Sequence, residues 1–480
     1  MLFNSLIFAF FLPTVFFIYW FVVNKNVKIQ NIFLIVASYF FYGWWDWRFL
    51  GLIFFSSITD FFIGKILHQQ QKQLNRNLLM ILSLFTNLGV LFYFKYCNFF
   101  IENFVSLFSS IGISSNVTSL NIILPIGISF YTFQTLSYTI DIYKKQGKPT
   151  DDVVSFLAFV SFFPQLVAGP IERASNLVPQ FLKPRKFKYE DGVEGARLIL
   201  WGFLKKVVIA DNCAYFVNNI FDNYASQTGS TLVLGLILFA FQVYGDFSGY
   251  SDIAVGTARL FGIKLMDNFN FPYFSTSITD FWRRWHISLS TWLRDYLYTP
   301  MVMGLRSWGM KGIIFSTICS FTIIGFWHGP NWVYIVFGLF HGLVLSYEIL
   351  NSKRRKRWKK SMNKRVHFVL SLILTFTFYL FTLILFRSVS VTDATYYAEN
   401  IFSKSLFTMP AIIAPKYRMI YTLILILAFI ITEWYSKDKK HVLDVVNLSQ
   451  SKRWAIYAVV IGVIIVFGRF NNNDFIYFQF

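Results

Sequence analysis

Residues 353–386 read KRRKRWKKSMNKRVHFVLSLILTFTFYLFTLILF, a basic cluster that leads directly into a long apolar run. A membrane-spanning helix needs about 20 apolar residues, which the stretch 366–386 supplies. Lysine and arginine beside a span favour the cytoplasmic side of the membrane. The segment therefore predicts a helix that begins in the cytoplasm and crosses the membrane outward.

The composition of the whole chain is that of a protein with many such spans. Of its 480 residues, 55% are hydrophobic, 21% are aromatic and only 14% are charged. Average soluble proteins carry about 25% charged residues, and a soluble domain could not bury this much apolar surface. The composition excludes a disordered chain, a secreted disulfide scaffold and an ordinary cytosolic enzyme. It predicts an all-α polytopic membrane protein.

Apolar segments recur along the chain from its first residues. Some are too short or too polar to cross alone, so we expect about 11 crossings, with the others as re-entrant or interfacial helices. No soluble domain fits between them, which predicts one membrane domain over residues 1–480. The N-terminal segment lacks a basic leader and a cleavage site, so it is expected to be a span. The candidate spans are 2–23, 31–45, 48–67, 77–95, 120–140, 153–169, 193–210, 230–250, 312–327, 331–350, 366–386, 418–435 and 454–470.

The distribution of basic residues predicts the orientation. The loop 388–417 is poor in lysine and arginine, the span 418–435 returns, and lysines follow at 437–440, so the tail 471–480 is expected outside the cytoplasm. The net charge of +20 is explained by basic loops that meet anionic lipid headgroups, and we expect no nucleic-acid partner. Further basic stretches expected at the cytoplasmic face are 144–148, 183–188 and 205–206.

Several kinds of chemistry leave no pattern in this sequence. The three cysteines are isolated, so neither a disulfide framework nor a zinc site is indicated. No GxSxG, Walker, GxGxxG or HExxH motif occurs. A transporter remains an alternative, because broken helices with polar residues also describe transporters, but no inverted pair of such segments is visible.

Ionisable residues in the apolar context of residues 279–296 require an explanation, because unpaired charges in a membrane are costly. At helical spacing Asp280 can pair with Arg283 or Arg284. His286 lies between aromatic rings and is followed by hydroxyl residues. The pattern favours an amphipathic or re-entrant helix that faces a cavity. The alternative is an interfacial helix with Trp and Arg at headgroup level.

A second polar site lies between two long apolar runs, at residues 324–332. Gly329 and Pro330 are expected to end a helix after His328, and Asn331 can cap the next helix. Imidazole is the side chain best suited to exchange a proton near neutral pH, so His328 is a candidate base. The alternative is a structural histidine that binds a carbonyl freed by the break.

Other polar residues are scattered through the apolar segments. Each could line a cavity, and each could equally pack helices together. His341 follows His328 by 13 residues, which places it on another face of a helix, so we expect a satisfied core histidine. The remaining polar islands are Gln134, Glu172 with Arg173, and Asp246 with Asp252.

In this order, the polar islands resemble the membrane-bound O-acyltransferase family, and within it the bacterial alginate O-acetyltransferase-like branch. The teichoic-acid D-alanyl-transfer branch is a more distant match. The resemblance covers nearly the whole chain. The matching strings are LPIGISFYTFQ (124–134), FPQLVAGPIER (163–173), DFWRRWHISLSTWLRDY (280–296) and FWHG (326–329).

The resemblance implies a ring of transmembrane helices around a thinned central funnel and tunnel, with re-entrant helices. It also implies acyl transfer from a cytoplasmic thioester across the membrane. His328 matches the family's invariant histidine, and His286 matches its second polar position. The other residues that the resemblance places along the tunnel are Arg283, Trp285, Ser288, Trp292, Trp327, Asn331 and Gln134.

The same resemblance sets expectations for substrates and partners. We expect no bound cofactor or metal, and acetyl-CoA or another acyl thioester as the donor. The product would be an O-acetylated surface polysaccharide, either an alginate-like exopolysaccharide or peptidoglycan. The protein itself is expected in a bacterial inner membrane. An extracytoplasmic SGNH-type acetyltransferase is expected to complete the transfer. D-alanyl transfer to teichoic acid is the alternative.

The C-terminal tail, residues 471–480, reads NNNDFIYFQF. This ending resembles an FIYxxF-like motif of this branch and of small partner proteins in the D-alanyl system, which implies that Tyr477 carries the acyl group. The alternative is an aromatic anchor at the membrane interface, the usual meaning of Phe and Tyr beside a last span.

Overall fold

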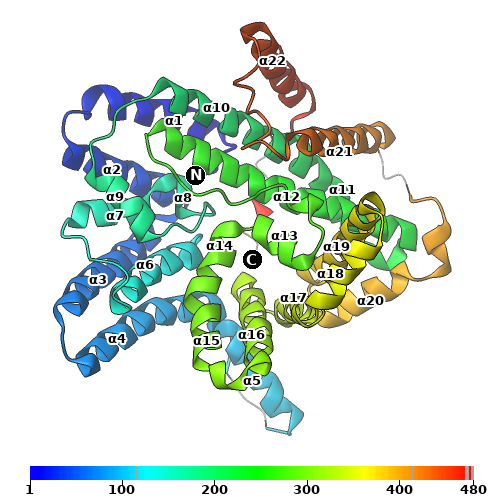
Figure 1. Cartoon of the computed structure of the whole chain (residues 1–480), viewed down its shortest axis with the longest axis horizontal. Helices are drawn as coiled ribbons and strands as arrows, with labels where there is room; N and C mark the ends of the chain where they lie inside the picture. The colour runs from blue at the N-terminus through cyan, green and yellow to red at the C-terminus, as the bar shows by residue number, and fades with distance from the viewer. Residues whose placement is uncertain (114–116, 412–414, 471–474, 477–480) are drawn as a thin grey trace. The chain divides into compact units, whose positions relative to one another are not determined.

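The computed structural model describes residues 1–113, 117–411, 415–470, 475 and 476. Over these residues the regular structure is entirely helical, which confirms the predicted all-α class (Figure 1). The chain forms two compact units. The first comprises residues 1–192 with 257–266, and the second comprises residues 193–256 with 267–480.

The first unit is held by a buried polar network among its long helices. Asp60 of α3 accepts hydrogen bonds from Ser83 and Asn87 of α4, both at 2.7 Å. Thr135 of α6 donates to the side chain of Asn87 at 3.1 Å. Such hydrogen bonds join helices where no water is available to replace them. The helices here are α1 (Leu6–Phe17), α2 (Val27–Asp46), α3 (Leu50–Gln69), α4 (Gln73–Leu91), α5 (Cys97–Ser110), α6 (Ile128–Tyr143), α7 (Val153–Ser161), α8 (Phe163–Leu166) and α9 (Ala174–Leu182).

The second unit is organised around the 32-residue helix α12. Helix α10 starts in the first unit and continues into the second, where a seven-residue π-helix, η4, follows it. π-helical turns are frequently found at functional sites. The helices are α10 (Tyr189–Phe203), η4 (Leu204–Ala210), α11 (Asp211–Asp222), α12 (Gly229–Leu260), α13 (Ile278–Arg284), α14 (Ile287–Leu293), α15 (Thr299–Gly304), α16 (Met310–His328), α17 (Trp332–Leu350), α18 (Ser352–Ser361), α19 (Lys364–Arg387), α20 (Val391–Ile401), α21 (Lys416–Ser436) and α22 (Gln450–Phe467).

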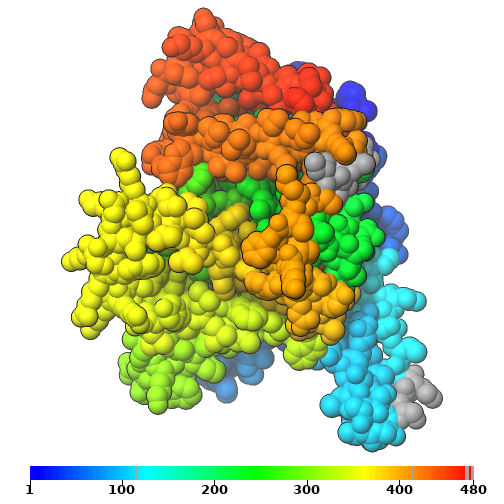
Figure 2. Space-filling view, turned by 90° about the vertical axis from the view of Figure 1, so that its right-hand side faces the viewer, coloured from blue at the N-terminus to red at the C-terminus, as the bar shows by residue number. Residues whose placement is uncertain are grey.

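Eight helical segments of the described chain are long and apolar enough to cross a membrane, by length and composition alone. The predicted count of about 11 crossings is larger, because α6 and α7 have only 16 and 9 residues. The predicted outward span is α19. The basic cluster before it forms α18, in which no residue is buried. It belongs to the yellow part of the chain in Figure 2.

Helices α16 and α17 form a tightly packed hairpin, side by side in Figure 1. A Cβ atom on Gly338 would overlap the carbonyl of Phe321, and one on Gly325 would overlap the carbonyl of Tyr334. Small residues at such contacts allow helix backbones to approach closely in a membrane. The position of the hairpin turn therefore depends on these two glycines.

Replacing Gly338 by alanine is expected to lower the unfolding temperature of the detergent-solubilised protein by several degrees. The helices would have to separate, and overpacking costs about 1–3 kcal/mol, which exceeds the roughly 1 kcal/mol that alanine gains in helix propensity. Gly462→Ala in α22 is the matched control, because nothing lies within 4 Å of a Cβ there. Equal unfolding temperatures for the two variants would contradict this account of the hairpin.

Candidate functional site

His328 is the last residue of α16, and its side chain is buried in a mainly apolar cavity of the second unit. The helix ends there as predicted, and the side chain of Asn331 caps α17 by accepting the N–H of Val333 at 3.1 Å. The rings of Phe337 and Phe386 lie 6.1 and 5.2 Å from the imidazole centroid. The cavity is lined by Val243, Phe247, Phe281, Trp282, Trp285, His328, Phe337, Tyr379, Leu383, Phe386 and Ile476.

His286 is also buried, but it flanks this cavity and is not among its lining residues. The centroid of its ring lies 4.7 Å from that of Phe247 and 6.0 Å from that of Trp327, which also contacts His328 at 5.2 Å. The structure therefore brings the two predicted histidines together around one tryptophan.

The backbone of His286 is strained. Its φ of 44° lies in the left-handed region, which a residue with a side chain adopts only when its surroundings impose it. His286 lies outside the eight candidate spans, and burial lowers the pKa of its ring well below the usual value, with nearby His328 acting in the same direction. The imidazole of His286 is therefore neutral at pH 7.

Helix α13 is positioned by a buried carboxylate from α17. Glu348 accepts the backbone N–H groups of Ile278 and Thr279, at 3.0 and 2.9 Å, and so satisfies the free donors at the start of α13. Arg355 pairs with the same carboxylate at 3.0 Å. At the other end of α13, Arg284 pairs with Asp280 at 3.0 Å, one of the two partners predicted.

Asn268 fixes the first turn of α14, directly after His286, and its role left no recognisable signal in the sequence. Its backbone carbonyl accepts the N–H of Ile287 at 2.9 Å, and its side-chain oxygen accepts the hydroxyl of Ser288 at 2.9 Å. Its amide nitrogen donates to Ser251 of α12 at 3.1 Å. Ser288 therefore positions this turn and is not among the residues that line the His328 cavity.

The other predicted tunnel residues lie in different surroundings. Trp285 and Trp327 are buried near His328, as expected. Trp292 is buried against Tyr296, and Arg283 is exposed. Gln134 is buried in α6 of the first unit, and Asn331 acts as a helix cap.

Two further predictions concern His341 and the tail. His341 accepts a hydrogen bond from Trp282 at Nδ1, at 3.2 Å, and its Nε2 lies 3.2 Å from the hydroxyl of Thr382. This confirms a satisfied core histidine. Tyr477 lies outside the described residues, but Ile476, which precedes it, is buried and lines the His328 cavity.

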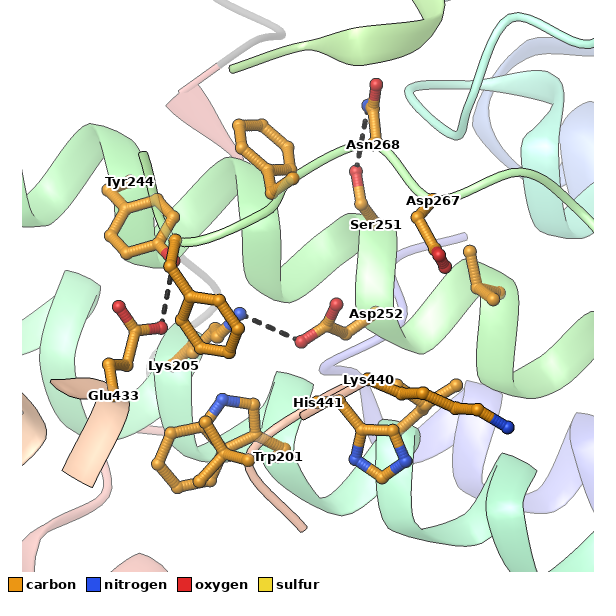
Figure 3. Close-up of a pocket in the computed structure, with 15 residues that line it drawn as sticks. Trp201, Lys205, Tyr244, Ser251, Asp252, Asp267, Asn268, Glu433, Lys440 and His441 are labelled. Carbon is orange, nitrogen blue, oxygen red and sulfur yellow. Dashed lines mark hydrogen bonds and ion pairs between the residues drawn. The ribbon is translucent and has the colours of Figure 1, made fainter. Parts of the chain in front are cut away.

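A second, polar pocket adjoins this region on the same long helix, α12 (Figure 3). Lys205 pairs with Asp252 at 2.9 Å across it, and the hydroxyl of Tyr244 donates to Glu433 at 2.8 Å. Lys205 and Lys206, which charge counting predicts at the cytoplasmic face, are buried in η4. The pocket is lined by Leu198, Trp201, Lys205, Tyr244, Ser251, Asp252, Val255, Asp267, Asn268, Phe269, Phe271, Glu433, Lys440, His441 and Val442.

Aromatic rings form the wall between the polar pocket and the His328 cavity. The ring centroid of Trp285 lies 5.0 Å from that of Phe269 and 6.1 Å from that of Tyr244. The centroids of Phe247 and Phe269 are 5.0 Å apart. The aromatic wall thus lies between the polar pocket and the apolar cavity that contains the imidazole of His328.

This arrangement suits proton transfer in a dry site. A neutral imidazole can take a proton from a hydroxyl nucleophile, and exclusion of water strengthens the interactions of the charges that form. Over the part of the chain that the structure describes, no group of three or more His, Cys, Asp or Glu could hold a metal ion. The chemistry that the two imidazoles can supply is acid–base catalysis.

Comparison with known proteins identifies the family. A family model for membrane-bound O-acyltransferases matches residues 39–392. A probable alginate O-acetylase AlgI of Azotobacter vinelandii is 41% identical over 354 residues, covering 72% of this chain and 68% of the relative. A peptidoglycan O-acetyltransferase of Helicobacter pylori is 36% identical over 425 residues, covering 82% and 78%.

A teichoic acid D-alanyltransferase of Bacillus subtilis is similar at lower identity, 32% over 277 residues, covering 55% of this chain and 69% of the relative. Both histidines of the site, and the aromatic wall beside them, lie inside the range matched by the family model. The chain therefore belongs to the membrane-bound O-acyltransferase family and is a multi-pass membrane O-acyltransferase.

Proposed function

We propose that this protein moves an acetyl group from a thioester donor in the cytoplasm across a bacterial inner membrane, for O-acetylation of a surface polysaccharide. The observation that carries the proposal is the position of His328, buried in an apolar cavity that one aromatic wall separates from a polar pocket. The relatives named for alginate and for peptidoglycan acetylation support a polysaccharide as the final acceptor.

The polar pocket is the proposed entry for the donor. Lys440 and His441 belong to the loop after α21, which charge counting predicts to be cytoplasmic. Along α12, Val243 and Phe247 line the His328 cavity, and Ser251 and Val255 line the polar pocket. At about 1.5 Å per residue, a donor arm that enters this pocket has only a short distance to cover before it reaches the cavity.

His328 is the proposed general base. The acceptor hydroxyl oxygen attacks the thioester carbonyl carbon while its proton passes to the imidazole. The carbon–sulfur bond then breaks, and the thiolate takes the proton from the imidazolium and leaves as a free thiol. His286 packs against Phe247, which lines the cavity, and against Trp327, so it would act by holding these rings beside the reacting groups.

Tyr477 is the proposed first acceptor, and a separate extracytoplasmic acetyltransferase of the SGNH type would take the acetyl group from it. A phenol with a pKa of about 10 forms an ester that is cleaved more readily than an alkyl ester. The described tail residue Ile476 lines the cavity of His328, which supports an acceptor in the following part of the chain. The C-terminus would then lie on the extracytoplasmic side.

Replacing His328 by alanine is expected to lower the release of free coenzyme A from acetyl-CoA at least 100-fold, because general acid–base catalysis contributes about 10²–10⁴-fold. The assay uses the purified protein in nanodiscs, together with the extracytoplasmic acetyltransferase that takes the acetyl group from it. His286→Ala should impair release strongly, and His341→Ala, outside the cavity, should impair it less. Undiminished release by a well-folded His328→Ala protein would rule out this mechanism.

Reversing the charge of Lys440 is expected to weaken donor binding. Lys440→Glu should raise the KM for acetyl-CoA about fivefold with kcat unchanged, because one exposed charge contributes about 1 kcal/mol to the attraction of donor phosphates. Lys437→Glu is the matched control, since it lies in the same loop but its ammonium packs over Trp434, outside the pocket. An equal rise in both variants would argue against donor entry here.

Tyr477→Phe separates the relay from the anchor interpretation. The variant keeps the ring and loses only the hydroxyl. A relay therefore predicts that polysaccharide acetylation is lost, whereas an anchor predicts that it is almost unchanged. Mass spectrometry of the C-terminal peptide, isolated without the partner enzyme, should show one added acetyl group on Tyr477. Full activity of Tyr477→Phe would contradict the relay.

A further inference from the structure

Residues 475 and 476 lie in the helical core of the second unit. The backbone N–H of Ile476 donates to the carboxylate of Asp246, in the middle of α12, at 2.6 Å. Phe475 is buried, and its ring lies 4.7 Å from that of Tyr250. In Figure 1 this short red segment lies between α12 and α13. A residue at the end of a chain, beyond its last span, is thus held beside a buried carboxylate.

Asp246 belongs to a buried cluster of charges. The ammonium of Lys206 lies 2.5 Å from Asp246 and 3.0 Å from Asp211, and all three side chains are almost fully buried. Charges inside a membrane protein are costly and commonly mark a functional site. Here a single cation faces two carboxylates, so negative charge is in excess. A further hydrogen-bond donor to the second oxygen of Asp246 therefore stabilises the cluster. The N–H of Ile476 is that donor, and the Lys206 ammonium also lies 4.4 Å from the ring centroid of Phe475.

The same helical stretch also holds the chain where it leaves α22. Asn212 donates to the carbonyl of Phe467, the last residue of α22, at 2.9 Å. The backbone N–H of Arg469 donates to the carbonyl of Val207 in η4, also at 2.9 Å. The exit from α22 and the buried residues 475 and 476 are therefore attached to one support, the segment η4–α11 together with α12.

We propose that Lys206, Asp211 and Asp246 form a docking site for Phe475 and Ile476 of this same chain, which holds Ile476 against the His328 cavity. These three are positioning residues, because none of them lines that cavity. The pair Lys205–Asp252 offers a direct comparison. It lies on the same two helices and spans a similar distance, 2.9 Å, but it lines the polar pocket, whose lining does not include residues 475 and 476. The consequence of docking for acyl transfer rests on the function proposed above.

The test measures hydrogen exchange of the C-terminal peptide by mass spectrometry, on the full-length protein in nanodiscs without donor or acceptor. The amide of Ile476 should be protected in the wild-type protein. Asp246→Asn should speed its exchange at least tenfold, because a carboxylate acceptor and the charge balance of Lys206 are lost together. Asp252→Asn, the matched control, should leave the protection of the tail unchanged.

A second pair of variants changes only the tail, so it stays informative even if Asp246→Asn fails to fold. Phe475→Ala removes the ring that packs on Tyr250 and Lys206, and it should also speed exchange at least tenfold. Phe470→Ala, at an exposed phenylalanine of the same segment, should not. Exchange that is unprotected in the wild-type protein, or unaffected by Phe475→Ala, would overturn the docking site.

The readout separates this inference from the proposed function. Exchange is measured without any acyl transfer, so a tail that is not an acceptor would still show protection if it docks. Faster exchange in Asp246→Asn with unchanged acetylation of the polysaccharide would support docking and contradict the acceptor role of the tail. Reduced acetylation with an unchanged KM for acetyl-CoA would support both.

Discussion

The close contact between α16 and α17 is the constraint on which the rest of the site depends. Two backbones touch at Gly325 and Gly338, where no side chain larger than hydrogen fits. This contact holds α16 against α17, and so keeps the imidazole of His328, at the end of α16, in the cavity. A helix can end inside a membrane protein only where neighbours satisfy its free backbone groups. Asn331 does this for the start of α17.

Helix α12 then joins the parts of the site that differ in polarity. One side of its middle section offers Phe247 to the His328 cavity, and its later turns offer Ser251 and Asp252 to the polar pocket. Directly before Phe247, Asp246 engages Lys206 and the backbone N–H of Ile476. A single helix thereby sets the spacing among the polar pocket, the His328 cavity and Ile476.

Several features of this site were predictable because they depend on residues close together in the chain. The break after His328 follows from Gly329 and Pro330, which cannot continue a helix. The pair Asp280–Arg284 follows from helical spacing. The burial of Lys205 and Lys206 was not predictable, since a lysine beside an apolar run resembles a cytoplasmic anchor. Their partners on α12, Asp252 and Asp246, lie 40 or more residues away in the chain. The docking of Ile476 on Asp246 spans 230 residues and leaves no local pattern.

The sequence by itself determined the all-α membrane class, because lipid requires long apolar helices whose composition is visible residue by residue. It also determined which histidine ends a helix, and the family resemblance rests on the same short polar strings. Only the tertiary structure decided that His286 packs against Trp327, that Asn268 holds the turn after it, and that Asp246 of a buried ion cluster accepts the N–H of Ile476. Packing between distant helices decides these positions, and hydrophobic spacing along one helix carries no record of its partner.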